Sequence, residues 1–205
     1  MIDISSKKYI IFDLDGTIVR LGVDWPACRA EVKSLLIEKY PQLLTIFEEK
    51  EEELSKLGRK LTVETMGTVV FESLGRDVYE DFGFIQEKYE TSFSLDQAEV
   101  REEIVNFIKK QCKEHVFSIC SNNSLAGVQY TLDLLDIRNC FETIESRRPG
   151  RPPKPDRTIM TDLLGSLGAD IEECLYIGDN SVTDEGLAVS FKMDYLDYRD
   201  FISMI

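Results

Sequence analysis

Two carboxylates stand one residue apart at the end of an apolar run near the start of the chain. Residues 9–19 read YIIFDLDGTIV and place Asp13 and Asp15 directly after this run. Carboxylates that are crowded in apolar surroundings repel each other and destabilise a fold unless a cation lies beside them. Magnesium prefers an octahedral set of hard oxygen ligands, so the acidic pair predicts a Mg²⁺ site.

Three further strand-like segments of the chain are each followed by a polar group of a different kind. The segments are residues 115–120, 140–144 and 174–178, and the groups are Ser121 with Asn122, Lys154, and Asp179 with Asp184, respectively. In an open parallel sheet, ligands bind beyond the carboxyl ends of the strands. We therefore expect one site that is assembled from four distant pieces of the sequence.

The elements between these segments read as helices. Residues 121–137 offer polar caps before an apolar stripe of helical spacing, and residues 155–168 place a proline first and a glycine last. The first helix is expected to have its cap among Asn122, Asn123 and Ser124 and its buried stripe at Leu125, Val128, Leu132 and Leu135. The second is expected to begin at Pro155, to bury Ile159, Leu163 and Leu167, and to end at Gly168. Strands that alternate with helices predict an α/β fold, a Rossmann-like parallel sheet flanked by helices.

Residues 20–94 break this alternation and look helical throughout. Prolines and glycines divide the stretch into helices of ordinary length, with Pro26 and Pro41 as starts and Gly58 and Gly75 as ends. One of these helices is expected to bury the stripe Leu43, Phe47, Leu54 and Leu57. The pattern predicts a discontinuous α/β core, residues 1–19 and 95–205, with an all-helical cap inserted at residues 20–94.

Charge and composition exclude several classes of protein. The formal net charge is −14, which argues against a nucleic-acid partner because a phosphate backbone is bound by clustered Lys and Arg. The local exception is residues 147–157, RRPGRPPKPDR, which form either a solvated loop or a positive rim that attracts anions.

Neither a membrane span nor a secretory signal is recognisable. No stretch approaches the roughly 20 uninterrupted apolar residues that a span needs, and the initial MIDISSKKY lacks an apolar signal region. The five cysteines are widely spaced and odd in number, so we expect free thiols. These features predict a cytoplasmic protein without a membrane partner.

In this order along the chain, the residues resemble the haloacid dehalogenase (HAD) superfamily of phosphotransferases. The family's first motif, DxDGT, matches residues 13–17, and its fourth, GDxxxxD, matches residues 178–184. The second motif ends in a hydroxyl residue, here Ser121, and the third supplies a lysine, here Lys154. The helical insertion has the position of that family's cap of the first type, and within the family the chain resembles phosphoglycolate phosphatases.

The resemblance implies a role for each matched residue. Asp13 is expected to be the nucleophile that forms an aspartyl-phosphate, and Asp15 is expected to be the general acid and base. The implied partners of the phosphoryl group are Gly16, Ser121, Asn122 and Lys154. The implied ligands of Mg²⁺ are the Asp13 side chain, the Asp15 backbone carbonyl, Asp179 and Asp184.

The expected function is a Mg²⁺-dependent phosphatase of a small phosphorylated metabolite, present as a monomer or a homodimer. Dehalogenase and phosphonate-cleaving activities are disfavoured because those branches of the family lack the second acid, which is Asp15 here. A β-phosphoglucomutase-like phosphomutase shares the core, although Thr17 is more typical of phosphatases. A catalytically idle binding or regulatory protein is the third alternative, because residues 185–201 lack the Ala- and Gly-rich helix common in the family. Substrate contacts are expected from the cap, with Arg20, Trp25, Arg29, Arg59 and Arg76 as candidates.

Overall fold

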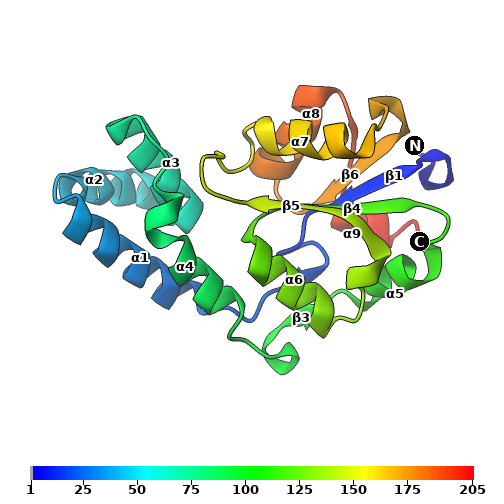
Figure 1. Cartoon of the computed structure of the whole chain (residues 1–205), viewed down its shortest axis with the longest axis horizontal. Coiled ribbons are helices and arrows are strands. Elements are labelled where there is room, and N and C mark those ends of the chain that lie inside the picture. The colour runs from blue at the N-terminus through cyan, green and yellow to red at the C-terminus, as the bar shows by residue number, and fades with distance from the viewer. Residues whose placement is uncertain (1) are drawn as a thin grey trace.

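A five-stranded, all-parallel sheet forms the centre of the protein. The computed structural model describes residues 2–205, and its sheet has the order β5-β4-β1-β6-β7 (Figure 1). The strands are β1 (Tyr9–Phe12), β4 (Val116–Ser124), β5 (Phe141–Arg147), β6 (Cys174–Gly178) and β7 (Asp194–Asp197). The predicted α/β class with a parallel sheet is confirmed.

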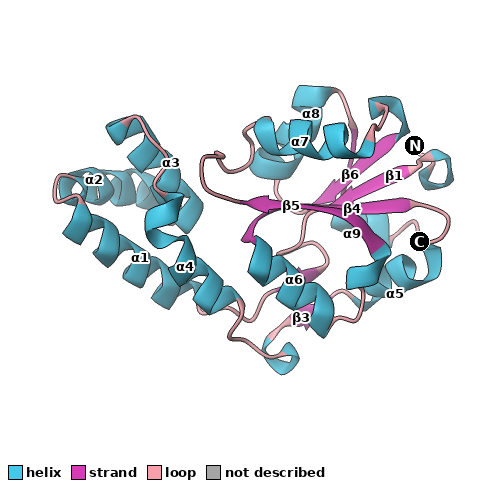
Figure 2. Ribbon diagram, in the orientation of Figure 1, coloured by secondary structure: helices cyan, strands magenta, loops and turns pink. Residues whose placement is uncertain are grey.

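Helices cover both faces of the sheet (Figure 2). One face carries α5 (Glu102–Gln111), α6 (Leu125–Leu134) and α9 (Tyr198–Ile202), and the other carries α7 (Thr158–Leu167) and α8 (Gly186–Phe191). Alternate residues of β1 therefore enter two apolar clusters: Ile10 and Phe12 pack toward the first group of helices, and Tyr9 and Ile11 toward the second. Burial on both faces explains why β1 is apolar without interruption.

The register of the sheet brings the site segments to one edge. Phe12 lies opposite Ile119 on one side and Ile177 on the other. The residues that follow these three positions therefore lie at the same level of the sheet, and Asp13 continues the ladder by donating its N–H to the Ile177 carbonyl at 2.9 Å. Parallel pairing in this register places three of the predicted motifs side by side.

Four helices are inserted between β2 and β4 and lie beside the sheet, at the left of Figure 1. They are α1 (Trp25–Lys39), α2 (Leu43–Lys56), α3 (Val63–Leu74) and α4 (Tyr79–Glu90). Pro26 lies in the first turn of α1, and Gly58 and Gly75 end α2 and α3 with positive φ angles of 67° and 70°. The helices bury an apolar cluster of their own, which includes Leu36, Phe47 and Phe82. The boundaries of the proposed core and cap remain a prediction.

A small antiparallel ribbon crosses the junction between the insert and the sheet. It pairs β2 (Val19–Arg20) with β3 (Glu99–Val100), so the expectation that residue 20 begins a wholly helical stretch is wrong. Two-residue strands have no periodicity, and only their pairing across 80 residues of chain reveals them. The remaining short elements are 3₁₀ turns at Ile4–Ser6, Leu95–Gln97, Arg138–Cys140 and Ile171–Glu173 and a π-helical turn at Ser181–Glu185.

Several details of the predicted helices need correction. Leu57 and Leu125 are exposed, because each lies at a helix end where the apolar stripe has already turned away from its core. Helix α7 begins at Thr158 instead of Pro155, since the Asp156 carboxylate accepts the Thr158 N–H at 2.8 Å and forms a turn there. Strand β4 continues to Ser124, which alone caps α6 by accepting the Gly127 N–H at 3.0 Å.

The C-terminal region completes the sheet although it lacks the Ala- and Gly-rich helix common in the family. Helix α8 and strand β7 are both present, and β7 pairs in parallel with β6. The predicted free thiols are also found: all five cysteines are unpaired in the described part of the chain. Among the helices of residues 2–205, none has the length and apolar composition that crossing a bilayer requires.

Candidate functional site

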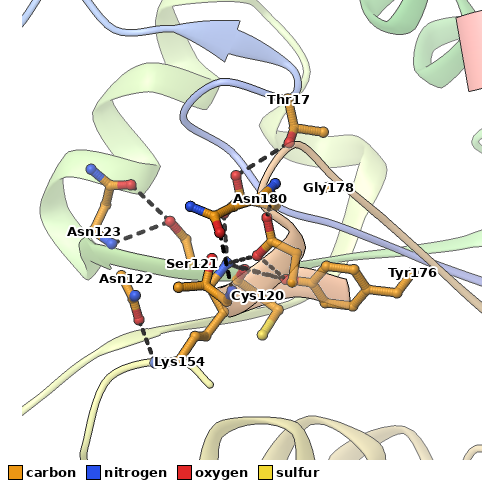
Figure 3. A network of polar contacts seen from close by, with 12 residues as sticks. Thr17, Cys120, Ser121, Asn122, Asn123, Lys154, Tyr176, Gly178 and Asn180 are labelled. Atoms are coloured by element: carbon orange, nitrogen blue, oxygen red, sulfur yellow. Dashed lines mark hydrogen bonds and ion pairs between the residues drawn. The ribbon is translucent and has the colours of Figure 1, made fainter. Parts of the chain in front are cut away.

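A buried lysine joins the first, third and fourth motifs. The Lys154 ammonium lies 2.7 Å from Asp13 Oδ1 and 2.7 Å from Asp184 Oδ1, and it also donates to the Cys120 carbonyl at 2.9 Å. Tyr176, from the middle of β6, accepts from the same ammonium through its hydroxyl at 3.1 Å. These contacts, several of which are drawn in Figure 3, bring together residues up to 141 positions apart in the sequence.

A third carboxylate stands beside this ion-pair network. The side-chain oxygens of Asp13, Asp179 and Asp184 lie within 4.8 Å of one another, and Asp179 faces solvent while the other two are buried. Three carboxylates around one ammonium leave an excess of negative charge, and their oxygens are the hard ligands that Mg²⁺ prefers. The donor set therefore fits the magnesium ion that the sequence predicts.

Two glycines allow the carboxylates to approach the backbone closely. Gly16 has a φ of +95°, and a Cβ there would lie 2.4 Å from Asp179 Oδ2. A Cβ on Gly178 would lie 2.6 Å from Asp184 Oδ2. Both distances are shorter than those of real Cβ atoms, so a larger residue at either position would displace a member of the acidic group formed by Asp13, Asp179 and Asp184. Gly16 itself does not line the cavity described below.

The surroundings of Asp13 oppose its ionisation. Burial raises the pKa of Asp13 to about 8, with Asp184 and Asp179 acting in the same direction and Lys154 acting against them. Burial lowers the pKa of Lys154, but Asp13 and Asp184 outweigh this effect and raise it, so the ammonium stays charged. One ammonium cannot compensate for several carboxylates at once, and a divalent cation beside them would lower the pKa of Asp13.

Asp15 is separated from this ion-pair network by the turn that follows β1. Its carboxylate accepts the Leu21 N–H at 2.9 Å, which holds the side chain at the junction between the sheet and the insert. Burial raises the pKa of Asp15 to about 6, and the charge of Asp179 contributes to the increase. A carboxyl group with such a pKa can both give and take a proton near neutral pH.

The irregular C-terminal end of β4, residues 121–124, forms the turn that holds the second motif. Asn122 accepts the Lys154 backbone N–H through its side-chain oxygen at 2.7 Å, which connects this turn to the loop of the third motif (Figure 3). Ser121 is fully buried, and its hydroxyl donates to Asn123 Oδ1 at 2.8 Å. Asn122 and Asn123 line the cavity, whereas Ser121 does not. The Ser121 hydroxyl therefore points toward its neighbour in this structure.

A cavity of about 810 Å³ lies between these motifs and the inserted helices. The core contributes Asp13, Asp15, Lys154, Asp179 and Asp184 to its lining. The insert contributes three of the predicted substrate candidates, Trp25, Arg29 and Arg59, together with further polar side chains that include Lys50, Lys60, Glu64 and Glu72. The other two candidates do not line it: Arg20 is in the ribbon strand β2, and Arg76 contacts the Tyr40 hydroxyl.

The basic segment 147–157 is only partly solvated: Arg148 and Arg157 are exposed, whereas its other basic residues are buried. Arg147 is buried and pairs with Asp77 at the beginning of α4, at 2.7 Å. Arg151 is buried as well and pairs with Glu145 at 2.5 Å. Because these charges are neutralised locally, only Lys154 of the segment reaches the acidic group.

Two polar side chains of the site were not assigned a role from the sequence. Tyr176 lies within a strand, where an aromatic residue is expected for packing alone. Thr17 donates its hydroxyl to Asp13 Oδ2 at 3.2 Å, and its place in the DxDGT motif was the only signal of this contact.

The chain belongs to the haloacid dehalogenase-like hydrolases, because the model of that family matches residues 7–188. A search of curated proteins by sequence found no significant match. Solved structures extend the comparison to the fold of the whole chain.

Three solved structures illustrate this similarity of fold. A predicted phosphoglycolate phosphatase from Haemophilus somnus is 16% identical, with a TM-score of 0.57 over 96% of this chain and 89% of that one. YfnB from Bacillus subtilis, assigned to the HAD hydrolases and solved with bound magnesium, is 16% identical, with a TM-score of 0.54 over 92% and 87% of the two chains. An HAD phosphatase from Thermococcus onnurineus is 20% identical, with a TM-score of 0.53 over 92% and 84%.

Proposed function

We propose that this protein is a Mg²⁺-dependent phosphatase that hydrolyses a small phosphomonoester through an aspartyl-phosphate on Asp13. The observation that supports the proposal best is that Asp13 and Asp184 pair with one lysine, with the Asp179 carboxylate beside them, at the wall of a single cavity. A turn with a purely structural role does not need three carboxylates close together, because buried carboxylates without full charge compensation destabilise the fold.

In the proposed reaction, an oxygen of Asp13 attacks phosphorus and the ester oxygen leaves. The leaving oxygen takes its proton from Asp15, and the phosphoryl group stays on Asp13. A water molecule then attacks phosphorus and loses a proton to Asp15, which releases orthophosphate and restores the Asp13 carboxylate. Two unit charges about 4 Å apart repel by roughly 4 kcal/mol at an effective dielectric constant near 20, so attack on a phosphate dianion requires positive charge nearby.

Lys154 provides part of this charge, since its ammonium already contacts Asp13. When bound, Mg²⁺ would supply the remainder by neutralising the phosphoryl oxygens, and Asp13, Asp179, Asp184 and the Asp15 carbonyl are the proposed ligands. Ser121, Asn122 and Gly16 are the proposed partners of the phosphoryl oxygens. Helix α6 begins directly after this turn and directs its positive end toward it.

The inserted helices favour a small anionic substrate. The helices and the loop that joins α2 to α3 contribute more basic than acidic side chains to the cavity, along with the flat indole of Trp25: Arg29, Lys50, Arg59 and Lys60 against Glu64 and Glu72. A cavity of about 810 Å³ is in the range that small-molecule ligands occupy in proteins. We therefore propose a phosphorylated metabolite instead of a phosphoprotein as substrate.

A phosphate-release screen over sugar phosphates, phosphoglycolate, nucleotides and aromatic phosphates, with and without Mg²⁺, tests the proposal. We expect release that requires Mg²⁺ and that Asp13→Asn abolishes. Asp136→Asn is the matched control, because Asp136 lies on the surface with a φ of 52°, which Asn also adopts readily. Wild-type turnover in the Asp13→Asn variant would disprove the nucleophile.

Two other results would point to the remaining alternatives. Isomerised sugar phosphate without release of orthophosphate would indicate a phosphomutase. An absence of release from every ester would favour a binding or regulatory protein.

A further inference from the structure

A buried carboxylate at the end of the insert contacts the turn of the second motif. Glu90 is the last residue of α4 and is fully buried. Its two oxygens accept four hydrogen bonds: from Gln86 Nε2 at 2.7 Å, Asn123 Nδ2 at 2.7 Å, the Ser124 N–H at 2.8 Å and the Ser124 hydroxyl at 2.5 Å. Three of these four donors belong to the turn at the end of β4, residues 121–124.

The identity of these donors fixes the orientation of the Asn123 amide. Above its pKa of about 7, the Glu90 carboxylate only accepts hydrogen bonds, so Asn123 must direct its NH₂ group toward Glu90. Its carbonyl oxygen then faces the opposite way and accepts the Ser121 hydroxyl at 2.8 Å, while the Asn123 backbone N–H donates to Ser121 Oγ at 3.2 Å. Glu90 therefore determines, through one intervening side chain, where the Ser121 hydroxyl points.

The packing around Glu90 holds it in this place. Gln86, one helical turn earlier in α4, also donates to the Asn122 carbonyl at 3.2 Å, so one face of α4 contacts three consecutive residues of the turn. Helix α6 leaves room for the carboxylate only because residue 127 is glycine: a Cβ there would lie 2.4 Å from Glu90 Oε2. Burial raises the pKa of Glu90 to about 7, and the donated hydrogen bonds counteract this rise.

We propose that Glu90 is a positioning residue of the phosphoryl site: it orients Asn123, and through Asn123 the Ser121 side chain, so that residues 121–124 hold one conformation before phosphate arrives. The proposal rests on the proposed function, because it assigns the turn to phosphate binding. It also gives the insert a part in the chemistry, since a residue of α4 orders a segment of the sheet edge.

Isothermal titration with inorganic phosphate in the presence of Mg²⁺ tests this inference directly. Glu90→Gln keeps the shape of the side chain but replaces one acceptor oxygen by an NH₂ group, which faces a donor whichever way it turns. Losing a hydrogen bond to a charged group costs enough to predict that the Kd for phosphate rises about tenfold. Steady-state hydrolysis of p-nitrophenyl phosphate provides a second readout, in which kcat/KM falls by a similar factor.

A double-variant cycle separates positioning from general destabilisation. Ser121→Ala removes the hydroxyl that Glu90 is proposed to orient, so adding Glu90→Gln to Ser121→Ala should weaken phosphate binding by less than about twofold. The matched control is Thr131→Val: Thr131 is fully buried on α6, and its hydroxyl donates to the Gly127 carbonyl at 2.8 Å, away from the turn. We expect Thr131→Val to lower the unfolding temperature and leave the Kd for phosphate unchanged.

The inference is overturned if Glu90→Gln folds and binds phosphate as tightly as the wild type, or if its effect and that of Ser121→Ala are additive. If Glu90→Gln does not fold, Asn123→Ala takes its place in the same cycle, since it leaves Glu90 its contacts with Gln86 and Ser124. A wild-type protein that binds phosphate but hydrolyses no ester disproves the proposed function alone. One that binds no phosphate overturns both.

Discussion

Replacing Lys154 by methionine removes the ammonium from the centre of the acidic group while keeping a side chain of similar length. The side chain is 2% exposed, and its ammonium pairs with Asp13 and Asp184, both at 2.7 Å. Breaking a buried ion pair by removing one partner costs about 3–5 kcal/mol, because the remaining charge stays buried without compensation. We expect the free energy of unfolding of Lys154→Met to fall by that amount without Mg²⁺ at about pH 9, where Asp13, whose pKa is about 8, is ionised.

The loss is large enough to measure by thermal and urea unfolding. For a chain of this length, about 3–5 kcal/mol corresponds to a decrease of roughly 6–20 °C in the unfolding temperature. Lys109→Met is the control, since Lys109 is exposed and lies 3.8 Å from the exposed Asp136. An exposed pair of this kind contributes about 0–1 kcal/mol, so the control should unfold almost as the wild type does.

Two further measurements test the reason for the loss. Asp13→Asn in the Lys154→Met background removes one of the uncompensated charges and should restore part of the stability, although it abolishes the proposed activity. Mg²⁺ should stabilise Lys154→Met more than the wild type, because the cation replaces the missing positive charge. If Lys154→Met unfolds within about 1 kcal/mol of the wild type without Mg²⁺, Lys154 is not the buried countercharge and the reasoning is wrong.

Three other predictions follow from the same geometry. Gly16→Ala should lower the affinity for Mg²⁺ at least tenfold in a calorimetric titration, because its Cβ would collide with Asp179. The control is Gly150→Ala, which also has a positive φ, +75°, but has no atom of residues 2–205 within 4 Å of the new Cβ, so it should bind Mg²⁺ normally. Equal affinities of the two variants would contradict this prediction. In chelator, the free energy of unfolding should decrease as the pH rises from about 4 to about 8, because Asp13, Asp15 and Glu90 have raised pKa values and keep protons in the folded state that the unfolded chain has lost. Mg²⁺ should flatten this pH dependence. A free energy of unfolding that increases with pH would disprove the prediction. Asp77→Ala leaves the buried Arg147 without its carboxylate partner and removes the acceptor of the Gly150 N–H. The free energy of unfolding in urea should therefore fall by about 3 kcal/mol, and limited proteolysis should cleave residues 147–157 faster. Unchanged cleavage would argue against this contact.

The sequence by itself determined the elements that carry the site and the order in which they occur. An uninterrupted apolar run identifies Tyr9–Phe12 as a strand buried on both faces, and the left-handed glycines Gly58, Gly75 and Gly168 mark helix ends correctly. These features are local, because burial on both faces and positive φ angles restrict the residue types at each position. The motifs then name the acidic residues, since their spacing within each segment is itself a property of the sequence.

Only the tertiary structure decided which of these polar atoms meet. Lys154 is 141 positions from Asp13, and no local pattern states that its ammonium lies between Asp13 and Asp184. The same holds for Glu90, which reads as an ordinary polar residue at the end of a helix until the fold places it against Asn123. Helical and strand periodicities describe a residue's own element, whereas contacts between distant elements depend on how the whole sheet and its inserted helices pack together.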